Sequence, residues 1–236
     1  MKIDSPNNPR LQELRRLARR RRREQSGRFV AEGEDLLAAA ERAGWPAIER
    51  FVAAGSGLEG IEVEPQALAT VSALGSGTRA IGLYEQRWAT PTGSLAVYLH
   101  GVGDPGNVGT IVRSALAFGA GSVVLGPGCA DPYGPKAVRA SMGAVFAVPL
   151  ARATRLDELP GRTIALAAHR GTPLRGPLDG EATLLVGAER DGLPEELIAA
   201  ADETCRIPIA AESLNAAMAA TVALYELSRP SRVPAG

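Results

Sequence analysis

Histidine and cysteine, the side chains that most often bind transition metals, are scarce in this sequence. Its 236 residues include two of each, Cys129, Cys205, His100 and His169. The cysteines stand alone, without the CxxC spacing of a zinc site and without the density of a disulfide framework. We therefore expect ordinary buried or half-buried thiols and no bound metal.

Long apolar runs are also missing. No run approaches the roughly 18 residues that a membrane-spanning helix needs, although 45% of the residues are hydrophobic and 22% are charged. The sequence opens with Met1-Lys2-Ile3-Asp4 and shows no signal-peptide core. We expect a cytoplasmic protein with a real hydrophobic core and no membrane partner.

Lysine is limited to Lys2 and Lys136, so nearly all positive charge comes from arginine. The net charge is zero, but residues 1–30 hold ten basic and three acidic residues, which leaves +7 there and −7 on the rest. Seven arginines occupy the nine positions 15–23 with no acidic residue among them. Because phosphate contacts release counterions, this run indicates nucleic acid as a partner. The alternative is a charged, solvated helix face.

The arginine run lies in a segment with clear helix signals. Asn8 is a good N-cap, Pro9 suits the first helical position, leucines at 11, 14 and 17 form one apolar face, and Gly27 is placed to end the helix. We predict one helix between Pro9 and Gly27. The predicted RNA contacts of this segment are Arg15, Arg16, Arg19, Arg20, Arg22 and Arg23.

The chain is predicted to hold two domains. Residues 1–92 read as a small α/β unit, and turn-forming residues gather at 86–94. Residues 93–236 alternate strand-like and helix-like runs, which is typical of a mostly parallel sheet. We place the boundary near residue 92.

The segment Gly101 to Gly106 matches the G-x-G-x-x-G dinucleotide fingerprint. A nicotinamide-dependent enzyme is therefore one alternative. However, the next strand ends at Leu125 without the acidic residue that would hold the ribose, and Asn107 is predicted to cap the helix that follows.

Three segments carry a more specific pattern. Residues 104–120 contain Asn107 and, six positions later, Arg113. Residues 131–144 place Lys136 and Arg139 three positions apart on one helix face, a spacing suited to neighbouring phosphates. Residues 184–215 run from a strand through a Gly-Ala-Glu loop and an Ile-Pro turn to Ser-Leu-Asn. Together they resemble the motifs of SpoU/TrmH-family RNA ribose 2'-O-methyltransferases of the SPOUT superfamily.

This resemblance implies an α/β catalytic domain (93–236) whose mostly parallel sheet ends in a trefoil knot, preceded by an RNA-binding domain (1–92). It implies S-adenosylmethionine as cofactor, RNA as substrate, most simply ribosomal RNA or else tRNA, and a homodimer. Methyl transfer from a sulfonium needs no metal, in keeping with the scarcity of histidine and cysteine. A non-catalytic RNA-binding or ribosome-assembly factor on the same scaffold is the other alternative.

The resemblance also assigns the site. Catalytic roles fall to Asn107, Arg113, Glu189, Ser213 and Asn215, and cofactor contacts fall to Gly187, Ile207, Pro208, Leu214 and Asn215. A guanidinium group is hardly ever deprotonated in a protein, so Arg113 acts either as an unusual base or as an electrostatic stabiliser. The loop reads Gly-Ala-Glu-Arg where the family usually has Gly-Asn-Glu-Gly, so its local contacts must differ.

Overall fold

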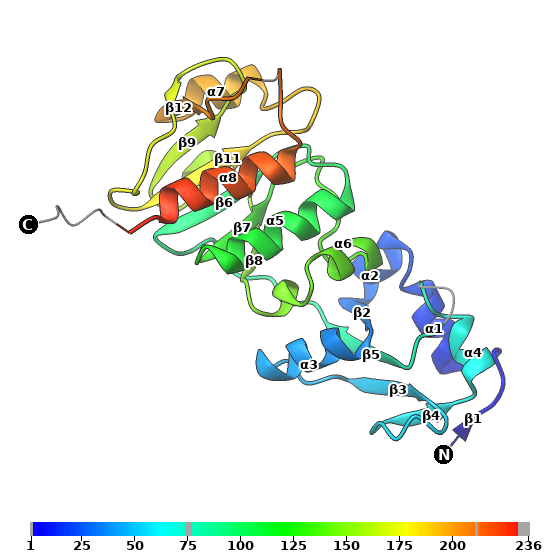
Figure 1. Cartoon of the computed structure of the whole chain (residues 1–236). Helices are drawn as coiled ribbons and strands as arrows, with labels where there is room; N and C mark the ends of the chain where they lie inside the picture. Colours follow the sequence, from blue (N-terminus) through cyan, green and yellow to red (C-terminus); the bar gives the residue numbers. More distant parts are fainter. Residues whose placement is uncertain (1, 74–76, 211, 231–236) are drawn as a thin grey trace, which may run out of the picture. The chain divides into compact units, whose positions relative to one another are not determined.

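The chain folds into two compact units in a computed structural model that describes residues 2–73, 77–210 and 212–230. The first unit combines Met1–Arg87 with Asp131–Ala147, and the second combines Trp88–Ala130 with Val148–Gly236. Figure 1 shows the helices and strands coloured along the sequence.

The first unit is built on a five-stranded mixed sheet in the order β1-β4-β3-β5-β2. Strands β1, β4 and β3 run parallel, and β5 pairs antiparallel with both β3 and β2. The strands are β1 (Lys2–Ile3), β2 (Arg28–Glu32), β3 (Glu49–Ala53), β4 (Ile61–Val63) and β5 (Ala80–Glu85). The helices are α1 (Pro9–Arg16), α2 (Arg20–Ser26), α3 (Glu34–Arg42), α4 (Pro65–Ala69), α6 (Pro135–Ala140) and the 3-10 turn η1 (Ala144–Phe146).

The N-terminal arm forms two helices, so the prediction of a single helix was wrong. The start was predicted correctly, since the side chain of Asn8 accepts from the Arg10 N–H at 3.0 Å, and Gly27 ends α2 with a φ of 66°. Between α1 and α2 the carbonyls of Leu17 and Ala18 accept from the guanidinium of Arg23 at 2.7 and 2.9 Å. In a continuous helix these carbonyls would accept from backbone N–H groups four residues on, and a buried arginine replaces those bonds.

Residues 131–147 pack with the first unit, although the prediction placed them in the second domain. The reason is an aromatic cluster. Tyr133 lies 4.7 Å from Phe29 between ring centroids, and Phe146 lies 5.0 Å from Tyr84 and 5.3 Å from Trp45. Aromatic rings each bury a large apolar surface, so their packing holds this segment in the first unit. The functional division into domains 1–92 and 93–236 stays a prediction.

The second unit contains a seven-stranded sheet in the order β10-β12-β9-β11-β6-β7-β8, and every pairing in it is parallel. This confirms the predicted mostly parallel sheet. The central strands are buried along their whole length, as expected for a parallel sheet covered on both faces. The strands are β6 (Leu95–Leu99), β7 (Ser122–Leu125), β8 (Leu150–Arg152), β9 (Arg162–Leu166), β10 (Thr172–Pro173), β11 (Ala182–Val186) and β12 (Glu203–Arg206).

Two long helices lie side by side in this unit, α5 (Pro105–Ala117) and α8 (Ala216–Ser228) (Figure 1). Their contact includes a hydrogen bond of 2.6 Å between the hydroxyls of Ser114 and Thr221. The remaining helical segments are α7 (Glu195–Ala200) and the 3-10 turn η2 (Leu156–Glu158).

Helix α5 begins earlier than predicted. Its N-cap is Asp104, whose carboxylate accepts from the backbone N–H of Asn107 at 3.0 Å, and Pro105 occupies the first helical position. The prediction that Asn107 caps the helix was wrong, because an aspartate followed by a proline makes the stronger start signal. The side chain of Asn107 is therefore free for other contacts.

Two features are missing from the described ranges 2–73, 77–210 and 212–230. None of their helices combines the length and apolar character needed to cross a bilayer. No group of three or more histidine, cysteine, aspartate or glutamate side chains in these ranges is arranged to hold a metal ion.

Candidate functional site

A cavity of about 370 Å³ lies where the carboxyl ends of β9, β11 and β12 meet. Because neighbouring parallel strands end at the same edge, the loops that follow them converge there, and ligands of parallel α/β sheets bind at this edge. The loop after β9 contributes residues 166–170, and the loop after β11 contributes residues 186–193. The segment between β12 and α8 completes the wall with Ile207, Ile209, Glu212, Ser213 and Leu214.

A polar cluster adjoins this cavity. The side-chain amide of Asn107 donates a hydrogen bond to Oε1 of Glu189, which is a wall residue. The amide of Asn215 donates to Oδ1 of Asn107 at 3.2 Å. Asn215 also caps α8, since its Oδ1 accepts from the N–H groups of Ala217 and Met218 at 2.9 and 3.3 Å. Asn107 thereby joins α5, the loop after β11 and the start of α8.

The loop after β11 is a tight turn that requires glycine at position 187. The backbones of Ala188 and Gly192 exchange hydrogen bonds of 3.1 and 3.0 Å. A Cβ atom on Gly187 would collide with the backbone of Gly192 and Leu193. The turn itself therefore requires glycine at position 187. The unusual Gly-Ala-Glu-Arg sequence still forms a closed turn, with Glu189 beside the cavity.

The structure brings most of the predicted cofactor and catalytic residues to one place. Gly187, Glu189, Ile207, Ser213 and Leu214 line the cavity. Asn107 donates a hydrogen bond to the wall residue Glu189, and Asn215 donates one to Asn107. Pro208 follows a wall residue but is not itself part of the lining.

Arg113 is the exception. It lies six residues beyond Asn107 on α5, about 9 Å along the helix axis and facing another side. Its side chain is exposed and makes no hydrogen bond or ion pair with the part of the chain that the structure describes. Asn107 and Arg113 belong to one sequence motif, but their side chains are not neighbours in the structure.

His169 and Arg170 are among the wall residues that were not predicted from the sequence. They directly follow β9, so the rule that ligands bind at the carboxyl ends of parallel strands would have pointed to them. Arg170 forms two hydrogen bonds with Glu195, of 2.8 and 2.6 Å. This pairing lowers the pKa of the Glu195 carboxyl.

The predicted RNA contacts lie in the first unit and differ in exposure. Arg16, Arg19, Arg20, Arg22, Lys136 and Arg139 are exposed. Arg15 is half-buried and donates to the carbonyls of Pro6 and Thr70 at 2.7 and 3.3 Å.

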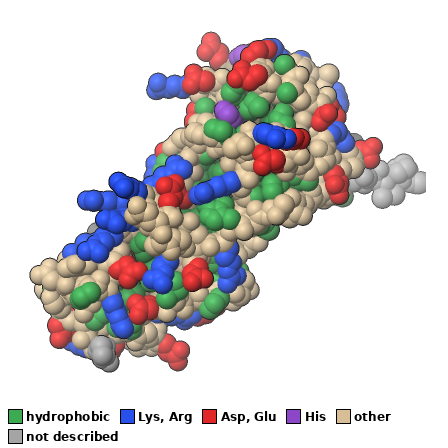
Figure 2. Space-filling view, turned by 180° about the vertical axis from the view of Figure 1, so that it is seen from behind, with side chains coloured by type: hydrophobic (Ala, Val, Ile, Leu, Met, Phe, Trp, Pro, Cys, Tyr) green, Lys and Arg blue, Asp and Glu red, His purple; other side chains and the backbone are tan. Residues whose placement is uncertain are grey.

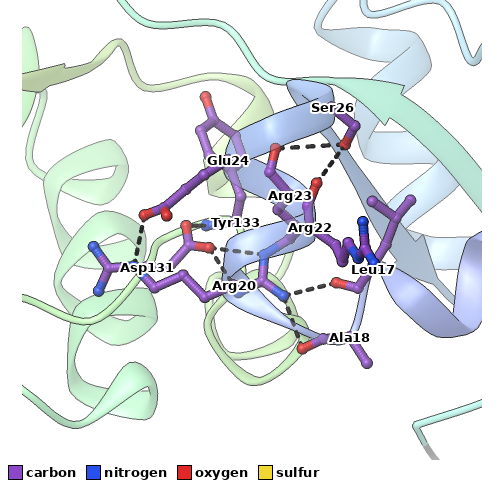
Figure 3. A network of polar contacts seen from close by, with 9 residues as sticks. All are labelled: Leu17, Ala18, Arg20, Arg22, Arg23, Glu24, Ser26, Asp131 and Tyr133. Atoms are coloured by element: carbon purple, nitrogen blue, oxygen red, sulfur yellow. Dashed lines mark hydrogen bonds and ion pairs between the residues drawn. The ribbon is translucent and has the colours of Figure 1, made fainter.

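Arg23 is a correction to the predicted set, because only 4% of it is exposed. Figure 3 shows its guanidinium between Asp131 and the carbonyls of Leu17 and Ala18, with Nε and Nη2 2.7 and 2.6 Å from Oδ2 of Asp131. Arg23 is an internal residue and is not available to RNA.

Both parts of the chain match known families. Residues 94–225 match the model of the SpoU rRNA Methylase family. Residues 8–82 match the MRM3-like substrate binding domain.

Individual relatives agree with these matches. The chain is 28% identical over 247 residues to the 23S rRNA (guanosine(2553)-2'-O)-methyltransferase RlmP of Bacillus subtilis, covering 95% of this chain and 98% of the relative. It is 40% identical over 146 residues to an uncharacterized tRNA/rRNA methyltransferase of Mycobacterium bovis, covering 56% of this chain. That match takes in 50% of the mycobacterial protein, so the chain spans about half the length of this relative.

A solved structure is similar over nearly the whole chain. The AdoMet-bound rRNA methyltransferase from Sinorhizobium meliloti superposes with a TM-score of 0.85 at 31% identity, covering 96% of both chains. The nicotinamide alternative is set aside, since residues 101–106 do not line the cavity and the matches are to methylases. The motif resemblance is confirmed, and the chain belongs to the SpoU rRNA methylase family.

Proposed function

We propose that this protein transfers a methyl group from S-adenosylmethionine to a ribose 2'-OH of ribosomal RNA. The observation that carries the proposal is the cavity at the carboxyl edge of the sheet, with Asn107, Glu189 and Asn215 joined beside it. The names of two relatives support the choice of reaction, because one is an rRNA 2'-O-methyltransferase and another was solved with AdoMet bound.

The residues around the cavity fit such a cofactor. A volume of about 370 Å³ lies within the range of about 300–1,000 Å³ that is usual for small-molecule sites. Leu166, Ile198 and Ile207 offer apolar surface for a purine base, and Glu189 offers a carboxylate for a cationic centre. Leu214 and the backbone at Gly187 and Pro208 complete the proposed set. When bound, S-adenosylmethionine supplies a methyl group on a positively charged sulfur that a hydroxyl oxygen can attack.

The protein must then orient the ribose and ease the loss of its hydroxyl proton. In this proposal Asn107 and Asn215, with Ser213 beside them, hydrogen-bond the ribose. Glu189 holds the Asn107 amide in place. Arg113 stabilises the developing negative charge or the adjacent phosphate, because a guanidinium group is a positively charged hydrogen-bond donor.

A homodimer would explain why Arg113 points away from its own cavity. Four exposed apolar side chains, between 42% and 59% accessible, follow the two adjacent helices: Leu116 on α5 and Met218, Val222 and Tyr225 on α8. Exposed apolar side chains that gather on neighbouring helices are typical of protein–protein interfaces. Arg113 stands one helical turn before Leu116, so pairing these helices with a second copy would bring Arg113 to the site of that copy.

Three further assignments rest on the family. We infer that the segment after β12 threads into a trefoil knot, a feature that the resemblance to enzymes of the SPOUT superfamily implies. We also place the protein in the cytoplasm, supported by its rRNA-modifying relatives. The exposed arginines of the first unit, with Lys136 and Arg139, would bind the RNA, supported by the match to a substrate-binding domain.

The test is a methylation assay. Purified protein is incubated with radiolabelled S-adenosylmethionine and undermethylated total RNA, beside an Arg113→Ala control, and label is mapped to large rRNA, small rRNA or tRNA. Label on one rRNA that disappears with Arg113→Ala supports the proposal. Label on tRNA would identify tRNA, and not rRNA, as the substrate. RNA binding without label in any class would favour the non-catalytic RNA-binding factor.

A further inference from the structure

A second cavity, of about 230 Å³, lies on the surface around α2 and is lined by Arg19, Arg21, Arg22 and Gln25. All four side chains are exposed, and no carboxylate is part of the lining. Figure 2 shows Lys and Arg side chains gathering in a group that projects from the surface at the left of the view. A hollow whose walls are three guanidinium groups and one amide offers hydrogen-bond donors to a single anion.

The charge in this cavity is not compensated by the protein. The side chains of Arg19 and Arg21 make no hydrogen bond or ion pair with the described residues, and the Arg22 side chain donates to Oε1 of Gln25 at 3.3 Å. Arg20, by contrast, pairs with Glu24 at 2.9 Å and does not line the cavity. Like charges held close together repel one another, and a bound anion would relieve that repulsion.

The buried Arg23 fixes the backbone that carries these side chains. Its ion pair with Asp131 and its bonds to the carbonyls of Leu17 and Ala18 set the break between the two helices (Figure 3). At that break Arg19 is extended, with φ −90° and ψ 127°, and its carbonyl accepts from the N–H of Arg22 at 3.0 Å. The turn therefore places Arg19 beside the first turn of α2 before any ligand arrives, which reduces the ordering cost of binding.

We propose that this cavity binds a backbone phosphate of the substrate RNA, an inference that rests on the proposed function. Guanidinium groups match phosphate oxygens with paired, charge-assisted hydrogen bonds. The site contacts the backbone, so it fixes the position of the RNA and does not read its sequence. It includes Arg21 and Gln25, which the sequence had not singled out, and it excludes Arg23 from direct contact.

The experiment compares full-length protein with the single variants Arg19→Gln, Arg21→Gln and Arg22→Gln. Arg42→Gln is the matched control, because Arg42 is exposed in the same unit, outside this cavity, and without a partner among the described residues. Binding of unmodified rRNA transcripts is measured by fluorescence anisotropy over a series of KCl concentrations. Methyl transfer to the same transcripts is measured in parallel.

Each cavity variant is expected to lower the slope of log K against log salt by about one, while Arg42→Gln leaves it unchanged. Unchanged slopes in all three cavity variants, or slopes lowered equally by Arg42→Gln, would overturn the phosphate site. Failure of the wild type to bind the transcripts would also overturn it. A failure of the proposed function would give a different result, in which the wild-type protein binds RNA but transfers no methyl group.

Discussion

Asn215 donates a hydrogen bond of 3.2 Å to Asn107, although the two residues are 108 positions apart in the chain. The side-chain amide of Asn107 in turn donates a hydrogen bond to Glu189, which lines the cavity. Asn107 thus satisfies an acceptor, the Glu189 carboxylate, and a donor, the Asn215 amide. The geometry of the proposed site depends on both bonds, and they should be energetically coupled.

Substituting either asparagine should lower methyl transfer without abolishing the fold. Asn107→Ala leaves Glu189 free to move, and a misplacement of about 1 Å can cost about 100-fold in rate. In a double-mutant cycle with Asn215→Ala, kcat/KM should reveal a coupling of about 0.5–3 kcal/mol, as expected for residues in contact. Thermal melts serve as control, since loss of the Asn215 cap costs about 1 kcal/mol by itself. Strictly additive effects on kcat/KM would contradict the shared role.

Gly187→Ala should weaken binding of S-adenosylmethionine because the added methyl group collides with the backbone of Gly192 and reshapes the loop. The matched control is Gly103→Ala in the same unit, where a Cβ would meet only the Gly101 carbonyl at 3.9 Å. Isothermal titration calorimetry measures both, with circular dichroism to verify folding. Equal affinities for the two variants would show that the loop tolerates the change.

Arg23→Met should be the most damaging substitution in the arginine run, even though it lies outside the proposed RNA surface. Removing one partner of a buried ion pair leaves Asp131 without its counter-charge, at a cost of about 3–5 kcal/mol. Arg21→Met removes an exposed charge and should change stability by no more than about 0.5 kcal/mol. Urea unfolding of the two variants provides the comparison, and similar losses in both would mean that Arg23 is not the structural residue we describe.

Introducing a charge among the exposed apolar side chains of α5 and α8, the proposed dimer interface, should separate a dimer into monomers. Met218→Glu and Val222→Glu would each place a carboxylate in the proposed interface, and a buried unpaired charge is strongly unfavourable. Sedimentation velocity measures the outcome, with Ile48→Glu as control, since Ile48 is an exposed apolar residue of the other unit. If Met218→Glu and Val222→Glu both sediment like the wild type, these side chains are not the interface.

High pH should destabilise the protein through Tyr84. Burial raises the pKa of Tyr84 to about 12, above the ordinary value of 10.0, so the folded state favours the neutral phenol. The resulting stabilisation is fully present below pH 10 and is lost as the pH rises toward 12. Tyr84→Phe should reduce this alkaline loss, as followed by urea midpoints at pH 7, 9.5 and 11.

The same variant should cost little at pH 7. The Tyr84 hydroxyl is buried and finds no hydrogen-bond partner among the described residues, so removing it leaves no new unpaired group. A large loss of stability at pH 7, or an unchanged alkaline profile, would contradict this account.

The family and the class of sheet can be predicted from the sequence because both depend on patterns that are local along the chain. The Asn8 cap and the stop at Gly27 are of the same kind, and the structure confirms both. The break between α1 and α2 depends instead on Asp131, which lies 108 positions from Arg23 and carries no local signal. Likewise, Asn107 looked like a cap because asparagine often is one, but Asp104 and Pro105 start the helix first.

Residues 131–147 have a consequence for how the protein is made. The first unit needs Tyr133 and Phe146 to complete the aromatic packing around Phe29, and these residues follow two strands of the other unit in the chain. Domains usually fold one after another as they leave the ribosome. Here the N-terminal unit lacks part of its aromatic core until residues 131–147 have been synthesised, after β6 and β7, and neither unit is one uninterrupted segment of the chain.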